Sequence, residues 1–151
     1  MIPGMAFAAL AAWLVTEGLG AWMLSRWVAH GGLRRAEPSS QVPPKVVAGH
    51  AGLAFGGFAC WVGFLASGSP VVAWLALALL APAIGLGIST VTIWTPYPVR
   101  PDPVDELVAR ILAPPAKPNR SPGLAPLVPA AHGVSALATF LFAMLAAITA
   151  R

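Results

Sequence analysis

The 151-residue chain is short of charge, since charged residues make up only 9% of it while hydrophobic residues make up 58%. An average soluble domain is about a quarter charged, and a water-soluble fold needs polar side chains to cover its surface. The sequence instead contains long apolar stretches, each close to the ~20 residues that span a bilayer. This composition excludes an ordinary soluble domain and predicts an integral membrane protein with several spans.

The chain also lacks the signatures of common catalytic sites. Its single cysteine, Cys60, lies inside an apolar segment and cannot form a disulfide within the chain. No phosphate-binding glycine loop, CxxC pair, HExxH motif or nucleophile elbow occurs in the sequence. The sequence therefore favours an electron-transfer or accessory subunit over a standalone enzyme, and we assign no catalytic residue.

Four apolar segments are present, and they predict an all-α bundle of four transmembrane helices in a single membrane domain. We expect the spans at about residues 2–27, 46–66, 71–94 and 127–150. The short link Ser67-Gly-Ser-Pro70 is typical of a tight turn, so the second and third helices should form an antiparallel hairpin. Within the long loop before the last span, residues 102–112 are predicted to form a short interfacial helix.

Basic residues gather in the two longer loops, 28–45 and 95–126. Eight of the nine lysines and arginines lie at or in these loops. Because cytoplasmic loops are enriched in lysine and arginine, both loops are predicted to be cytoplasmic and both termini outside, in the inner (plasma) membrane. This distribution is a topology signal, so the high isoelectric point of about 10.3 does not indicate nucleic-acid binding.

Two pairs of segments have matching sequences. The motif Gly18-Leu-Gly20 lies nine residues before Trp27, and Gly85-Leu-Gly87 lies nine residues before Trp94. A stripe of four residues at helical spacing also recurs, as Val46, His50, Ala54 and Phe58 and as Val128, His132, Ala136 and Phe140. These matches indicate two repeated helical hairpins in parallel orientation, related by a pseudo-twofold axis along the membrane normal.

The two matched histidines, His50 and His132, are the sharpest functional signal. Both lie about five residues after the cytoplasmic start of a helix, roughly 7–8 Å into the span. Ionisable side chains are costly in hydrocarbon, so a matched pair suggests a function. Neutral imidazoles are good ligands for haem iron and two can supply both axial positions. Small neighbouring residues would make room for the macrocycle, namely Gly49, Gly52, Gly56, Gly133 and Ala136. Three aromatic rings would line it, those of Phe55, Phe58 and Phe140.

This plan resembles that of four-helix cytochrome b proteins, which often bind haem between histidines on different helices. The resemblance implies a small b-type cytochrome-like protein or the membrane subunit of a redox complex, with one haem b near the cytoplasmic face. Its electron partner would be a quinone or an adjacent subunit. A single haem in one leaflet cannot carry an electron across ~30 Å of bilayer, which favours the subunit role.

Other interpretations remain open at this point. Each histidine would, in a cofactor-free protein, hydrogen-bond to polar backbone or to a hydroxyl, and the glycines would pack helices. The chain would then be an accessory or scaffold subunit that binds partner membrane subunits or forms a homo-oligomer. Chlorin pigments and copper are alternative ligands, whereas zinc prefers about four protein ligands. The third histidine, His30, follows the first helix and is expected at the interface, not at a metal.

The carboxyl group of Glu17 lies in the middle of the first span. It is expected to face the bundle interior, because a lipid-facing carboxyl would be costly. It would act as a proton site, or hydrogen-bond to a hydroxyl of Thr16, Ser89, Thr90 or Thr92. A further alternative is a small oligomeric transporter that uses Glu17 together with a helix kink at Pro82.

Overall fold

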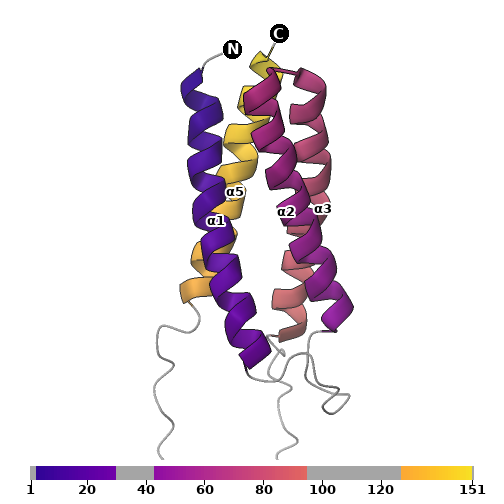
Figure 1. The fold of residues 1–151 in the computed structure, drawn as a ribbon. Coiled ribbons are helices and arrows are strands. Elements are labelled where there is room, and N and C mark those ends of the chain that lie inside the picture. The colour runs from indigo at the N-terminus through magenta and orange to yellow at the C-terminus, as the bar shows by residue number, and fades with distance from the viewer. Residues whose placement is uncertain (1–2, 30–42, 95–126, 151) are drawn as a thin grey trace, which may run out of the picture.

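The computed structural model describes residues 3–29, 43–94 and 127–150. This part of the chain forms helices α1 (Pro3–Ala29), α2 (Pro44–Ser67), α3 (Pro70–Trp94) and α5 (Leu127–Thr149), which run antiparallel to their sequence neighbours (Figure 1). The predicted four-helix membrane bundle is confirmed, and every helix begins and ends within two residues of the predicted span. The predicted interfacial helix at 102–112 lies outside the described residues, as do residues 30–42 of the first basic loop and all of the second.

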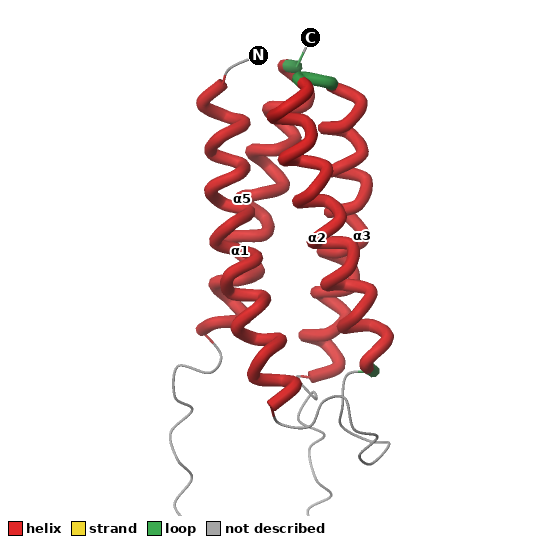
Figure 2. Tube along the Cα trace, viewed as in Figure 1, coloured by secondary structure: helices red, strands yellow, loops and turns green. Residues whose placement is uncertain are grey.

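Proline and glycine set the helix boundaries. Pro3, Pro44 and Pro70 each occupy the first position of a helix, where proline fits because its missing N–H would have no partner within the helix. Gly68 ends α2 with φ of +69°, a left-handed conformation that glycine adopts without strain, and its N–H donates to the Phe64 carbonyl. The chain then re-enters a helix at Pro70, so the predicted tight turn is present (Figure 2).

The helices are suited to a lipid bilayer. All four are long and apolar enough to cross a membrane, and even the 23 residues of α5 extend about 35 Å, more than the ~30 Å hydrocarbon layer. Large apolar side chains cover the outer surface, among them Phe7, Leu14, Val71, Trp74, Ile88, Val134, Leu137 and Ile148. A contiguous apolar exterior of this kind is what a multi-pass membrane protein presents to lipid.

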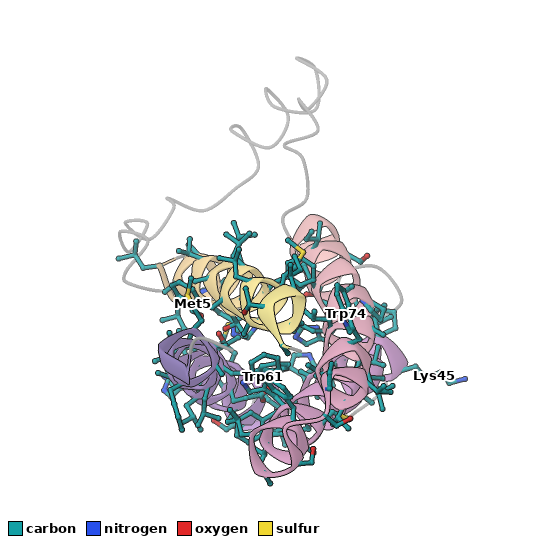
Figure 3. All side chains as sticks on the ribbon, turned by 90° about the horizontal axis from the view of Figure 1, so that it is seen from above. Met5, Lys45, Trp61 and Trp74 are labelled. Carbon is teal, nitrogen blue, oxygen red and sulfur yellow. The ribbon has the colours of Figure 1, made fainter. Side chains whose placement is uncertain are left out.

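The bundle consists of two closely packed helix pairs. Helix α1 packs most extensively against α5, and α2 packs most extensively against α3. Smaller contacts between α1 and α2 and between α3 and α5 join the pairs. In the view along the bundle, α2 and α5 consequently lie diagonally across from one another, as do α1 and α3 (Figure 3).

The buried core fills only the end of the bundle that holds the termini and the 67–70 turn. It contains Trp13 and Thr16 at its inner limit on α1, Trp61 and Phe64 on α2, and mainly alanines elsewhere. Figure 3 shows Trp61 pointing into the interior. At the opposite end, none of the described side chains is buried; this end comprises residues 17–29, 44–56, 84–90 and 127–138. The two helix pairs are therefore held together at one end and less closely packed at the other.

Candidate functional site

His50 and His132 face each other across the less closely packed end of the bundle. Their ring centroids lie 6.0 Å apart, and the ring planes make an angle of 69°. The residues come from the diagonal helices α2 and α5, and both are half-buried. The structure thus brings together the two residues that the sequence repeat singled out.

Each histidine is anchored to the backbone of its closely packed neighbour helix. The Nδ1–H of His50 donates to the Ala83 carbonyl of α3 at 2.8 Å, and that of His132 donates to the Thr16 carbonyl of α1 at 3.0 Å. A backbone carbonyl only accepts, so Nδ1 must carry the proton in both rings. In a neutral imidazole the other nitrogen, Nε2, then has a free lone pair and is the atom available to a metal.

Two glycines leave the space in which the rings lie. A Cβ built on Gly20 would lie 3.1 Å from Cε1 of His132, and a Cβ on Gly87 would lie 3.1 Å from Cε1 of His50. Ordinary contacts between carbon atoms are about 3.5–4.0 Å. Each ring therefore rests against a glycine one helical turn beyond the carbonyl that it bonds.

The two halves of this arrangement are copies of one another. Thr16 and Gly20 on α1 correspond to Ala83 and Gly87 on α3 at a constant offset of 67 residues, the same offset that relates the two Gly-Leu-Gly motifs. The packed pair α1/α5 accordingly repeats the packed pair α3/α2. This agreement in hydrogen bonding and ring contact gives the repeat seen in the sequence a structural counterpart.

Sequence reasoning placed the small residues of the site incorrectly. Gly49 and Gly56 pack against Leu86 and Leu79 of α3, while Gly52 and Gly133 are exposed and a Cβ there would meet nothing within 4 Å. Gly20 and Gly87 make the space for the imidazole rings, which is distinct from the room for a macrocycle, and the repeat of the Gly-Leu-Gly motif is the sequence signal that marks them. The expected aromatic lining also differs, because Phe55 is half exposed, and Phe58 and Phe140 pack against the core at the other end.

Glu17 lies next to this site, at the border between the core and the less closely packed end. Its carboxyl interacts with the Trp13 indole and with the His50 imidazole, and the residue is half-buried. The Oε1 atom is enclosed and has no hydrogen-bond partner among the described residues. The hydroxyls of Thr16 and Thr90 were expected to bond to the Glu17 carboxyl, but they bond to other groups. Thr16 bonds to the Ala12 carbonyl and to other hydroxyls, and Thr90 bonds to the Gly87 carbonyl. The Thr92 side chain lies outside the described part of the structure.

A hydroxyl cluster joins α1 to α5 just beyond the His132 anchor. The Thr16 hydroxyl lies 3.0 Å from that of Ser135 and 3.2 Å from that of Thr139. Ser135 donates to the His132 carbonyl, and Thr139, which is fully buried, donates to the Ser135 carbonyl. The corresponding positions on the other helix pair are Ala83, Leu53 and Gly57, so polarity around the site is concentrated on the α1/α5 side.

The donor set limits which metals fit. Among the described residues, no group of three or more His, Cys, Asp or Glu side chains could hold an ion, whereas a zinc site takes three or four protein ligands. Two imidazoles suit a metal whose other ligands come from elsewhere, as the four nitrogens of a porphyrin do. The third histidine, His30, lies outside the described residues.

Comparison of the chain with protein-family models, with curated proteins and with solved structures gave no match. The function must therefore be argued from the site itself.

Proposed function

We propose that the protein is a small b-type cytochrome-like membrane subunit that binds one haem between His50 and His132. The observation that carries the proposal is the facing pair of imidazoles, both held in the Nδ1–H form by backbone carbonyls. Metal-bound histidines almost always donate their other ring N–H to a carbonyl, carboxylate or water, which fixes the tautomer and orients the ring.

The ring separation is compatible with a shared metal. A metal about 2 Å from one nitrogen of each ring, held between the two rings, would place the ring centroids about 6 Å apart. The observed separation is 6.0 Å.

Haem, when bound, supplies one-electron chemistry, and the chain supplies ligation and position. The histidines lie five and six residues from the first residues of α5 and α2, which is roughly 8–9 Å along the helix. An electron carrier at that depth reaches one membrane face only, because the hydrocarbon layer is ~30 Å thick. This depth favours exchange with a quinone or a partner subunit at the face where the basic loops are expected, the cytoplasmic one.

A cofactor-free accessory subunit is the competing function. In that case the two Nδ1–H bonds to backbone carbonyls would be the whole role of the histidines, as polar contacts between transmembrane helices. This alternative accounts for the Nδ1 atoms but gives no reason for two Nε2 lone pairs on facing rings. It differs from the haem proposal in a single measurable quantity, the haem content.

The test is the haem content of protein purified from its native membrane. We expect a pyridine haemochrome value near one haem b per chain and a low-spin spectrum. The variants His50→Ala and His132→Ala should each lose six-coordinate binding, and His30→Ala is the matched control that should retain it. Metal analysis of the same sample separates haem iron from copper. A haem-to-protein ratio near zero in an intact bundle would refute the proposal and leave the accessory subunit as the better account.

A further inference from the structure

We infer that Gly20 and Gly87 are positioning residues, which hold the His132 and His50 rings in the Nδ1–H form with Nε2 free for a metal. The inference deepens the proposed haem site and makes a separate claim about the protein without cofactor. It rests on the contacts that each glycine makes with a ring from the neighbouring helix.

The first step concerns space. The built Cβ of Gly87 lies 3.1 Å from Cε1 and 3.5 Å from Nδ1 of His50, and that of Gly20 lies 3.1 Å from Cε1 and 3.6 Å from Nδ1 of His132. The atoms nearest each glycine are thus Nδ1, which donates the anchoring hydrogen bond, and the ring carbon Cε1 next to it. A methyl group at either position would push on the edge of the ring that faces the carbonyl.

The second step concerns the hydrogen bond. The ring can give way only by moving off the neighbouring helix, and the Nδ1–H bonds to Ala83 and Thr16 are already at 2.8 and 3.0 Å. Hydrogen bonds weaken as they lengthen and steeply as they bend. A weakened bond to the carbonyl fixes the proton on Nδ1 less firmly, and the tautomer with the proton on Nε2, which has no lone pair for a metal there, becomes more accessible.

The third step separates these glycines from glycines that serve helix packing in general. Gly18 and Gly85 belong to the same two motifs and lie two residues earlier on the same helices, yet a Cβ on either would meet nothing within 4 Å. A residue two positions away on a helix faces another direction. Gly18→Ala and Gly85→Ala are therefore matched controls for Gly20→Ala and Gly87→Ala.

The deciding experiment is nitrogen NMR of the histidine side chains in the purified, cofactor-free protein. In the wild-type chain, His50 and His132 should both show a protonated Nδ1 and an unprotonated Nε2. Gly87→Ala should shift only the His50 signals and Gly20→Ala only those of His132, while Gly18→Ala and Gly85→Ala should leave both unchanged. Circular dichroism checks that each variant remains helical.

The same variants have a second readout once haem is added. Loss of the group that orients a metal-bound histidine weakens metal affinity by about 10–100-fold, so we expect that loss in Gly20→Ala and Gly87→Ala but not in the controls. A wild-type spectrum with the proton on Nε2 would overturn the inference even if both alanine variants failed to fold. Alanine variants that match their controls would also overturn it, whereas missing haem binding with the expected NMR result would refute only the proposed function.

Discussion

Substitution of Gly57 by alanine tests whether the core at the closed end of the bundle is as tightly packed as the contacts indicate. Gly57 is buried on α2. A Cβ at this position would lie 3.1 Å from Cζ2 of Trp13 and 3.2 Å from the backbone oxygen of Ala76. The Trp13 ring cannot retreat easily, because it is 1% exposed and packs against Trp61 and Phe58 with centroids 6.0 and 6.2 Å away.

Two opposing effects set the magnitude. Adding a methyl group to a well-packed core costs about 1–3 kcal/mol, and replacing glycine by alanine within a helix recovers about 0.5–1 kcal/mol. For Gly57→Ala we therefore expect a net loss of up to about 2.5 kcal/mol. Gly52→Ala on the same helix is the matched control, since its Cβ would meet nothing within 4 Å, and it should gain about 0.5–1 kcal/mol.

The assay is reversible unfolding of both variants in mixed detergent micelles, followed by helical circular dichroism and by tryptophan fluorescence. The ordering Gly52→Ala, wild type, Gly57→Ala from most to least stable is the expected result. If Gly57→Ala were as stable as Gly52→Ala, the contacts of Gly57 with Trp13 and with the Ala76 backbone of α3 would be looser than described.

Three further predictions follow from named contacts. Oε1 of Glu17 is enclosed without a hydrogen-bond partner among the described residues, and an unsatisfied buried group costs about 1–3 kcal/mol, so Glu17→Leu should leave thermal stability unchanged or raise it; a clear drop would show that the interactions of this carboxyl with Trp13 and His50 outweigh that cost. Thr139→Val should cost about 0.6 kcal/mol, and at most about 1.7 kcal/mol, by removing a hydroxyl contact between helices, whereas Thr149→Val, which loses only bonds within its own helix, should cost less. A cysteine introduced at Ser69 should react with an impermeant thiol reagent in intact cells, while cysteines at Ser40 and Asn119 should not; labelling at Ser40 would reverse the predicted topology.

The sequence predicted the fold well because the signals involved are long and physically simple. Runs of apolar residues near bilayer length define the spans, and the predicted ends lie within two residues of the observed helix ends. The pairing of His50 with His132 was also within reach, since side chains four residues apart share one helix face and the same four-residue stripe occurs twice.

The partners of the histidines were not predictable, for two physical reasons. The acceptors are backbone carbonyls of Thr16 and Ala83, and every residue carries such a group, so no residue type marks them. Helix geometry also explains why the glycines next to the histidines in the sequence do not lie against the rings. A residue directly beside a histidine is rotated by about 100° around the axis, which is why Gly49 packs against Leu86 and makes no room for the ring.

The two halves of the internal repeat have the same residue where the site depends on a side chain or on the lack of one. They have different residues where only a backbone carbonyl is used. Histidine occurs at both 50 and 132, and glycine at both 20 and 87, because the ring and the space for it depend on those residue types. The carbonyls at 16 and 83 accept the same hydrogen bond although one belongs to threonine and the other to alanine. These positions are thus free to differ, and the hydroxyl of Thr16 is used in the cluster with Ser135 and Thr139. The environments of the two histidines therefore differ in side chains and not in the anchoring backbone, both at the hydroxyl cluster around Thr16 and at Glu17 and its counterpart Ile84.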